Sequence, residues 1–292
     1  MIQGSITALI TPFRDGKVDE EAFIQLVERQ IGAGTRALVP CGTTGESPTL
    51  SHEEHKRVVE LCIEAADGRV PVIAGAGSNS TAEAIDLMQH AKASGADAAL
   101  IVAPYYNKPT QEGLYAHFAA LNDAVEIPII VYNVPSRTIA DIGVETMGRI
   151  SKLRNVIGVK DATGDMERVP LHRRVCGADF LQLSGEDGNA VGFNAMGGKG
   201  CISVTANVAP DLCARMQEAA LAGDFGTAQE INFRLAALHK ALFIEPSPGP
   251  VKYACSVLGL CTPDMRLPLM QPTEASKAQI RAAMAEAGLN IA

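Results

Sequence analysis

Apolar residues follow two alternating patterns along most of the chain. Short runs rich in valine, isoleucine and alanine end at glycine, proline or polar residues, as is typical of strands buried on both faces. Between them, apolar residues recur every three or four positions, as in amphipathic helices. The expected strands are 5–10, 37–40, 70–74, 98–103, 127–132, 156–160, 180–183 and 201–204, and the expected helices after them are 23–31, 51–63, 81–94, 111–123, 141–151, 167–175, 187–196 and 210–222.

Eight strands that alternate with eight helices, in units of roughly 30 residues, predict an α/β fold of the (β/α)8 TIM barrel type. A doubly wound open sheet has the same local alternation, but eight units without a break in composition favour a barrel over residues 1–224. Three further helices then follow without strands, at 227–242, 251–258 and 273–287. We therefore expect a C-terminal helical extension over residues 225–292, kinked at a proline-rich segment.

The composition limits which partners the protein can bind and in which cellular compartment we expect it. Of the 292 residues, 47% are hydrophobic, enough for a full core, and the net charge of −8 disfavours a nucleic-acid or anionic-membrane partner. Seven scattered cysteines without a Cys-x-x-Cys pair fit reduced thiols. No basic and apolar leader opens the chain, and no apolar run reaches the length of about 18 residues that a membrane helix needs. We expect a soluble cytoplasmic protein.

Lys160 ends the apolar run 156–160. Lysine is rarely buried without a partner or a purpose, and a desolvated amine loses its proton more easily. The neutral amine can attack a carbonyl carbon and form a Schiff base. The alternative is a lysine that is solvated at the end of its strand or paired with Asp161. Active sites of such barrels lie at the carboxyl ends of the strands, so the residues after the other strands bear on this choice.

Polar residues gather at several of these strand ends. The glycines of Gly42–Glu46 allow a tight turn, in which backbone N–H groups near Thr43 and Thr44 can hold a carboxylate. The alternative is an ordinary Thr/Gly turn. Tyr132 ends the fifth strand and Tyr106 follows the fourth, and their hydroxyls can relay a proton with that of Thr44. Each tyrosine taken alone is also compatible with an amphipathic wall residue.

Arg137 lies in the stretch Tyr132–Thr138. Its planar guanidinium suits a second carboxylate, although a surface ion pair is the commoner fate of an arginine. Neither a metal nor a dinucleotide is indicated. His52 and His55 lie three positions apart at a helix start without a third ligand nearby, and residues 75–77 lack the third glycine of a dinucleotide motif.

Several of these stretches together carry a family resemblance. They are Gly42–Glu46, Tyr132–Thr138, Gly158–Lys160, Ile202–Asn207 and the Glu245-Pro246-x-Pro stretch. They closely resemble the dihydrodipicolinate synthases, also called 4-hydroxy-tetrahydrodipicolinate synthases, over almost the whole chain. These enzymes share the barrel fold and the Schiff-base lysine residue with a superfamily of pyruvate-dependent lyases that includes N-acetylneuraminate lyase.

The Thr43-Thr44 pair and Arg137 point to the synthases rather than to the other lyases. The resemblance implies condensation of pyruvate with L-aspartate 4-semialdehyde to 4-hydroxy-tetrahydrodipicolinate, without a cofactor, on the diaminopimelate route to L-lysine. It also implies the site residues: Lys160 forms the Schiff base, Thr43 and Thr44 hold the pyruvate carboxylate, Thr44, Tyr132 and Tyr106 relay protons, Arg137 binds the semialdehyde carboxylate, and Gly185 and Ile202 supply backbone groups.

The resemblance implies an assembly and an inhibitor as well. The family's equivalent of Tyr106 comes from a neighbouring subunit, and the usual assembly is a homotetramer built as a dimer of dimers. An inhibitory L-lysine site at the dimer interface matches Ser47, His52, His55, Gly77, Asn79, Glu83 and Tyr105. For the two histidines, helix capping and surface solvation remain the alternative. Pro48 and Gly249 depart from the family's usual residues, which bears on inhibition and on assembly respectively.

Two other functions compete with the synthase. A related aldolase or lyase that acts on a sugar acid would keep Lys160 and Tyr132 but use Arg137 differently. A non-catalytic barrel that binds or regulates would form no covalent adduct with pyruvate. Activity on each aldehyde or sugar acid, and trapping of pyruvate on Lys160, separate the three.

Overall fold

Eight parallel strands form the centre of the molecule in the computed structural model, which describes residues 2–291. Their order is β4-β1-β10-β9-β8-β7-β6-β5, and a bridge between Leu38 and Val72 joins the two ends. The predicted barrel is confirmed, and the open-sheet alternative is wrong. The strands are β1 (Gly4–Ala8), β4 (Ala37–Val39), β5 (Ile73–Gly75), β6 (Ala98–Val102), β7 (Ile129–Asn133), β8 (Val156–Asp161), β9 (Leu181–Ser184) and β10 (Gly200–Ser203).

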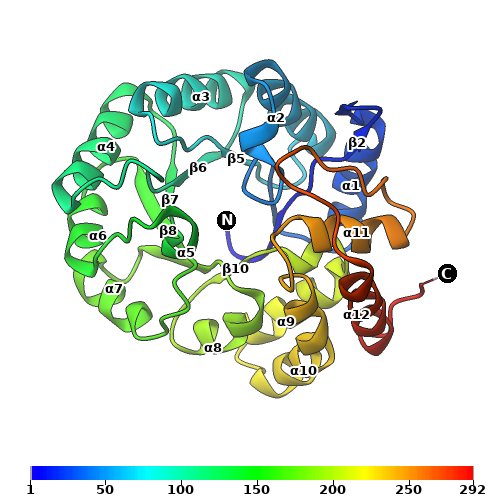
Figure 1. Cartoon of the computed structure of the whole chain (residues 1–292). Helices are drawn as coiled ribbons and strands as arrows, with labels where there is room; N and C mark the ends of the chain where they lie inside the picture. The colour runs from blue at the N-terminus through cyan, green and yellow to red at the C-terminus, as the bar shows by residue number, and fades with distance from the viewer. Residues whose placement is uncertain (1, 292) are drawn as a thin grey trace.

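A ring of helices surrounds the strands (Figure 1). Apolar residues from the helices and from the outer face of the strands make one large buried cluster, and residues such as Ile6, Ile130 and Ile202 fill the barrel interior. This double burial explains the continuous apolar runs of the sequence. The helices are α1 (Glu20–Gly32), α2 (His52–Ala66), α3 (Thr81–Ser94), α4 (Gln111–Ala124), α6 (Val144–Ile150), α7 (Arg168–Cys176), α8 (Ala190–Ala195) and α9 (Pro210–Leu221).

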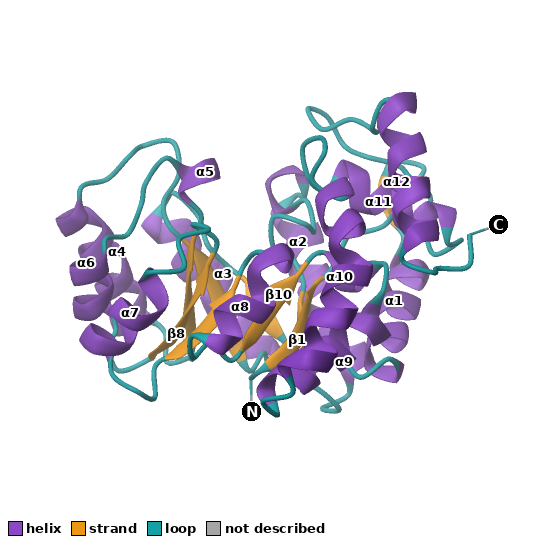
Figure 2. Cartoon of the chain, turned by 90° about the horizontal axis from the view of Figure 1, so that it is seen from below, coloured by secondary structure: helices purple, strands orange, loops and turns teal. Residues whose placement is uncertain are grey.

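The C-terminal extension lies on one side of the barrel, beside α1 and α9 (Figures 1 and 2). It consists of α10 (Phe225–Ala241), α11 (Gly249–Val257) and α12 (Glu274–Glu286), as predicted. Its buried residues form one cluster with those of α9. Because α9 shares this core, the division into domains at residues 224 and 225 stays a prediction. A side chain at Gly249 would meet the carbonyl oxygen of Met270 at 2.9 Å, which explains the glycine at this position.

Apolar periodicity does not predict the short elements between the main ones. A hairpin of β2 (Phe13–Arg14) and β3 (Lys17–Val18) turns at Asp15 and Gly16, both with positive φ, as Asp-Gly turns do. The other short elements are α5 (Pro135–Thr138) and the 3-10 turns η1 (Ser47–Thr49), η2 (Asp187–Asn189) and η3 (Thr205–Asn207).

Three strands, β5, β7 and β9, begin later than the pattern predicts, and β5 shows the largest difference. The expected strand at 70–74 is observed as β5, from residue 73, because Pro71 has no N–H to donate to a neighbouring strand.

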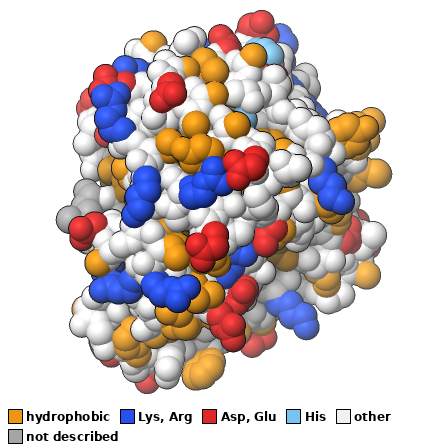
Figure 3. Space-filling view, turned by 90° about the vertical axis from the view of Figure 1, so that its left-hand side faces the viewer, with side chains coloured by type: hydrophobic (Ala, Val, Ile, Leu, Met, Phe, Trp, Pro, Cys, Tyr) orange, Lys and Arg blue, Asp and Glu red, His pale blue; other side chains and the backbone are white. Residues whose placement is uncertain are grey.

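Charged side chains of both signs are interspersed on the face shown in Figure 3. One ion pair between neighbouring helices is Arg149 of α6 with Glu112 of α4, at 2.5 Å. Within residues 2–291, no helix combines the length and the apolar character needed to cross a bilayer.

Candidate active site

Lys160 lies near the carboxyl end of β8 and faces the barrel interior. It pairs in register with Tyr132 of β7 and with Leu183 of β9, and both of these belong to the interior cluster. Its side chain is only 6% exposed, and its Nζ lies 4.1 Å from the centre of the Tyr132 ring. Among the described residues, no carboxylate lies within ion-pair distance of this amine. A buried lysine beside an acid–base side chain is the arrangement that Schiff-base chemistry needs.

Asp161, the alternative ion-pair partner of Lys160, belongs to β8 itself rather than to the loop after it. It is the last residue of β8 and is buried. Since side chains alternate along a strand, it points to the face opposite Lys160. Its carboxylate accepts hydrogen bonds from the backbone N–H and the hydroxyl of Thr163, at 2.9 and 2.6 Å, and lies 3.4 Å from the Arg168 guanidinium. Asp161 therefore does not hold Lys160 as an ion pair.

The Gly42–Glu46 loop follows β4. Thr44 is buried and Thr43 half-buried. Gly45 lies so close to the backbone of Leu9 and Cys41 that a Cβ would be 3.1 Å from each, so a side chain would need the loop to move. The Gly45 carbonyl accepts a hydrogen bond from the Thr11 hydroxyl at 2.7 Å. The loop is thus held firmly by the barrel.

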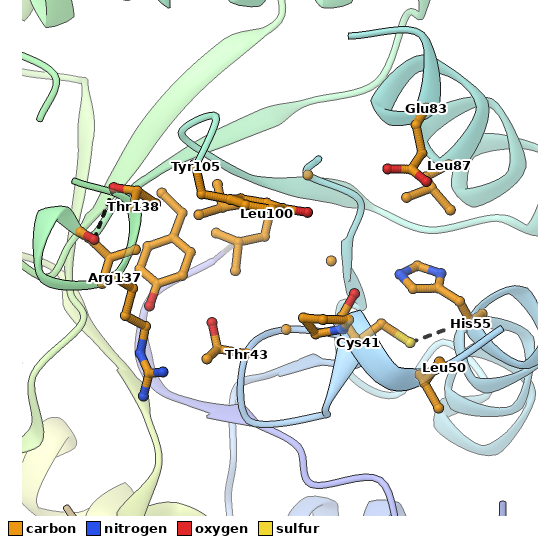
Figure 4. Close-up of a pocket in the computed structure, with 18 of the residues that line it drawn as sticks. Cys41, Thr43, Leu50, His55, Glu83, Leu87, Leu100, Tyr105, Arg137 and Thr138 are labelled. Carbon is orange, nitrogen blue, oxygen red and sulfur yellow. Dashed lines mark hydrogen bonds between the residues drawn. The ribbon is translucent and has the colours of Figure 1, made fainter. Parts of the chain in front are cut away.

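A cavity of about 340 Å³ opens beside this loop (Figure 4). Thr43, Tyr132 and Arg137 line it, and Figure 4 shows Thr43 and Arg137 on the same side. Arg137 is exposed and comes from α5, where Pro135 occupies the first helical turn. The structure therefore brings one threonine, one tyrosine and the arginine of the sequence prediction to a single cavity.

The other predicted site residues, Lys160, Thr44, Tyr106, Gly185 and Ile202, are not among the residues that line this cavity. Ile202 is fully buried in β10 and faces the interior with Leu183. Gly185 follows β9, and its N–H donates to the Asp161 carbonyl at 2.7 Å. Any Cβ there would lie 2.6 Å from that of Ala162, so glycine is required. Tyr106 is 92% exposed with a φ of 69°, and this single chain does not bring it to Lys160.

The same cavity reaches most of the predicted L-lysine site. Ser47, His52, His55, Gly77, Glu83 and Tyr105 line it together with Pro48, whereas Asn79 does not. In Figure 4, Glu83 and His55 lie on the side away from Arg137. His52 Nε2 is 2.9 Å from the Glu83 carboxylate, which also accepts a hydrogen bond from Ser78. Asn79 instead accepts a hydrogen bond from Asn107 through its backbone carbonyl, at 2.9 Å.

His55 is a buried histidine at this end of the cavity. Neither of its ring nitrogens has a hydrogen-bond partner among residues 2–291. Burial lowers the pKa of His55 to about 4, so its ring is neutral at pH 7.

Glu186 received no role from the sequence, yet its carboxyl group lies among the charged groups of the site. Burial, followed by the charge of Asp187, raises its pKa, and the charges of Lys160 and Arg137 oppose this rise. No pattern in the sequence marks Glu186 as different from its neighbours in the loop after β9.

A second feature that the sequence did not reveal is a polar network behind the site. Arg168 donates to both Asp141 oxygens at 3.1 Å and to the Ile142 carbonyl. Asn133 donates to the same aspartate at 2.8 Å. These contacts tie α7 to the end of β7 and to the segment that follows Arg137. In the sequence, Asn133 could have indicated this network, because it is a polar residue at the end of an apolar strand.

No group of three or more potential metal ligands occurs among His, Cys, Asp and Glu in the part of the chain that the structure describes. His52 and His55 lie instead beside Glu83, at the cavity described above.

The comparisons with known proteins agree with this geometry. A model of the dihydrodipicolinate synthetase family matches residues 1–287. The chain belongs to this family. Similar curated proteins are the 4-hydroxy-tetrahydrodipicolinate synthases of Parvibaculum lavamentivorans and Hyphomonas neptunium, each 63% identical, with 99% of this chain aligned to 99% and 100% of theirs. The chain is accordingly an enzyme of the lyase class.

Solved structures of the family share the fold. The dihydrodipicolinate synthase of Aquifex aeolicus is 47% identical and superposes with a TM-score of 0.97 over 99% of both chains. That of Acinetobacter baumannii, described as chloride-inhibited and complexed with pyruvate, is 46% identical, with a TM-score of 0.97 over 99% of this chain and 100% of the other. That of Cyanidioschyzon merolae, with lysine bound, is 37% identical, with a TM-score of 0.95 over 99% of both chains.

Proposed function

We propose that this enzyme condenses pyruvate with L-aspartate 4-semialdehyde to 4-hydroxy-tetrahydrodipicolinate through a Schiff base on Lys160, the first committed step of the diaminopimelate route to L-lysine. The observation that carries the proposal is the buried Lys160 amine, 4.1 Å from the centre of the Tyr132 ring, at the carboxyl end of a barrel strand. The names of the relatives support the substrates. No cofactor is needed, because the lysine itself activates the ketone.

The first half of the reaction forms a nucleophile from pyruvate. The neutral Lys160 amine adds to the carbonyl carbon of pyruvate, and the resulting carbinolamine loses water to give a protonated imine. Tyr132, whose ring lies beside the Lys160 amine, passes protons to and from these intermediates, with Thr44 and Tyr106 as further members of the relay. Thr43 and Thr44 hold the pyruvate carboxylate, and backbone groups of Gly185 and Ile202 lie near the bound pyruvate.

The second half forms the new carbon–carbon bond. Loss of a methyl proton converts the imine to an enamine, which attacks the aldehyde carbon of the semialdehyde. Arg137, exposed at the cavity, binds the carboxylate of this second substrate in bidentate fashion. The amino group of the semialdehyde then adds to the imine carbon, so that the ring closes and Lys160 leaves as a free amine.

Tyr106 joins the relay from a second subunit. Its 92% exposure supports this assignment, since a side chain that projects so far from its own chain is available to a neighbour. The active unit is then a dimer, and a homotetramer is a dimer of such dimers. The seven free cysteines fit a reducing compartment, the cytoplasm.

L-Lysine inhibits the enzyme at the end of the cavity lined by His52, His55 and Glu83. Glu83 suits the α-ammonium group of the ligand, and the two histidines lie near the path of its side chain. The lysine-bound enzyme of Cyanidioschyzon merolae supports L-lysine as a ligand. Addition of L-lysine should lower turnover of the protein, and Glu83→Gln should weaken that inhibition without lowering uninhibited turnover.

Turnover with paired substrates tests the proposed reaction. Purified protein is assayed with pyruvate plus L-aspartate 4-semialdehyde and, separately, with N-acetylneuraminate. We expect turnover only in the first assay, and none for Lys160→Ala in either. Turnover of the sugar acid without turnover of the semialdehyde would show that the enzyme cleaves a sugar acid and is not the synthase.

A further inference from the structure

A buried ion pair joins the C-terminal extension to the loop that carries Thr43 and Thr44. The Nζ atom of Lys252, on α11, lies 2.5 Å from Oε1 of Glu46, the last residue of that loop. Both side chains are fully buried. The two residues are 206 positions apart in the sequence. Lys252 also lies 3.9 Å from the centre of the Phe13 ring, which completes its apolar surroundings.

Stability alone does not explain why this ion pair is buried. Two charges lose their hydration on burial, and apolar residues of similar volume often stabilise a protein as well as a buried ion pair does. What an ion pair adds is a fixed position, because each charge must meet its partner at one distance and in one direction. The Lys252–Glu46 pair therefore fixes the location of the Glu46 side chain inside the protein.

The position of Glu46 in turn determines the turn that contains the threonines. Its backbone N–H donates to the Thr43 carbonyl at 3.2 Å, and its carbonyl accepts from the Thr49 N–H at 2.9 Å and from the Thr49 hydroxyl at 3.0 Å. Its φ of 56° lies in the left-handed region, which non-glycine residues adopt only when their surroundings hold them there. The ion pair with the buried Lys252 is one such constraint on this residue.

Arg266, also from the C-terminal part, contacts the same loop. Its backbone N–H donates to the second Glu46 oxygen at 3.3 Å. Its guanidinium donates to the Thr49 carbonyl at 3.0 Å and to both oxygens of Glu54 at 2.6 Å. The loop is thus tied to the extension at both Glu46 and Thr49.

We propose that Lys252 is a positioning residue for the pyruvate site: through Glu46 it orients Thr43 and Thr44 toward the carboxylate of the first substrate. This inference rests on the proposed function. Arg137 lies on a different loop, which is tied to Arg168 rather than to the extension. Loss of the pair should therefore raise the KM for pyruvate and leave the KM for the semialdehyde unchanged.

The test separates position from stability with a double variant. Lys252→Met and Glu46→Gln each leave one buried polar group without its partner, so each lowers the melting temperature. The combined variant carries no unpaired buried charge and recovers much of that loss. We expect the KM for pyruvate to rise roughly tenfold in all three, including the stable double variant, because a small misplacement of binding groups is costly. The KM for the semialdehyde should stay within roughly twofold of wild type.

Arg234→Met is the matched control. Arg234 of α10 donates to the Ala287 carbonyl at 2.6 Å, so its loss destabilises the extension without touching the loop. This variant should melt earlier but keep both KM values. A pyruvate KM that returns to wild type in the double variant, or that rises equally in Arg234→Met, would overturn the inference.

A substitute variant and a preliminary control experiment make every outcome of this test informative. If the Lys252 variants do not fold, Glu46→Asp carries the test, since it keeps the buried charge but shortens the side chain that meets Lys252: a raised pyruvate KM alone supports the inference, and unchanged values contradict it. Wild-type protein is first treated with pyruvate and borohydride. No adduct on wild type would overturn the proposed function itself, whereas an adduct on wild type with unchanged variant kinetics would overturn only the role of Lys252.

Discussion

Two loops at the carboxyl ends of the barrel strands are built very differently. The Gly42–Glu46 loop after β4 is largely buried and is held by Thr11, by Lys252 and by Arg266. The segment after β7 exposes Arg137 on the four-residue helix α5. In the proposed reaction, the first loop serves pyruvate, a small substrate that is bound covalently and must be oriented within the barrel. The second serves the longer semialdehyde, which is captured at the opening.

The largest effect is expected from the buried loop. Thr44→Val removes the hydroxyl while keeping the shape of the side chain. It should lower kcat by roughly a hundredfold or more, because a member of the proposed proton relay is lost. Steady-state kinetics with both substrates measures this. A fall in kcat of less than threefold would show that the Thr44 hydroxyl is not part of the chemistry.

The exposed loop should respond in binding rather than in the chemical step. Arg137→Ala should raise the KM for the semialdehyde by roughly a hundredfold, since a bidentate charged contact is lost, and leave the KM for pyruvate nearly unchanged. Arg154→Ala is a suitable control, because Arg154 forms only an exposed pair with Glu126 at 3.4 Å. Equal changes for both substrates would contradict the division between the loops.

Arg168 supports the exposed loop from behind. Arg168→Met leaves the buried Asp161 carboxylate without its cation, so the free energy of unfolding should fall by about 3 kcal/mol. The Asp141 carboxylate also loses one of its two anchors and keeps only the hydrogen bond from Asn133. The KM for the semialdehyde should therefore rise about 3- to 10-fold, with little change for pyruvate. Denaturant unfolding and kinetics check the two parts. A rise confined to the pyruvate KM would assign the network to the other loop.

We expect the smallest effect on activity at His55. Its backbone carbonyl accepts a hydrogen bond from the thiol of Cys41, the residue before the buried loop, at 3.5 Å. Burial lowers the pKa of this histidine from 6.5 to about 4. The neutral, buried ring of His55 therefore contributes its full share of stability above pH 6.5. This share is lost as the pH falls toward 4, because His55 binds a proton at a higher pH in the unfolded chain than in the folded protein. This loss amounts to about 3 kcal/mol at most.

His55→Gln should remove that part of the acid sensitivity. Urea unfolding at several pH values between 7 and 4 measures it, and the variant should lose stability less steeply than wild type. His52→Gln is the control, because His52 is exposed. Parallel curves for wild type and His55→Gln would show that the buried ring does not titrate in this range.

The sequence predicted those parts of the molecule that depend on local pattern. The barrel follows from repeated apolar runs, and Lys160 was singled out because a charged residue ends one of them. Thr43 and Arg137 follow strands and Tyr132 lies near the end of one, and the structure brings them to one cavity. The alternative pairing of Asp161 with Lys160 is not observed, since the strand continues one residue further than its apolar run and Asp161 lies on the opposite face.

Contacts between distant residues could not be predicted in this way. Lys252 lies within the apolar pattern of α11, and nothing near it in the sequence indicates that Glu46 is its partner. Arg168 and Asp141 meet only because α7 packs beside the end of β7. The role of Tyr106 depends on a second subunit, and it stays a prediction.

The most direct test of the account is covalent trapping at Lys160. The protein is incubated with pyruvate, reduced with borohydride and digested, and the peptide that contains Lys160 is weighed by mass spectrometry. We predict one reduced pyruvate adduct on Lys160, absent from Lys160→Ala and from protein reduced without pyruvate. An unmodified Lys160 peptide in wild-type protein treated with pyruvate would contradict the proposed mechanism.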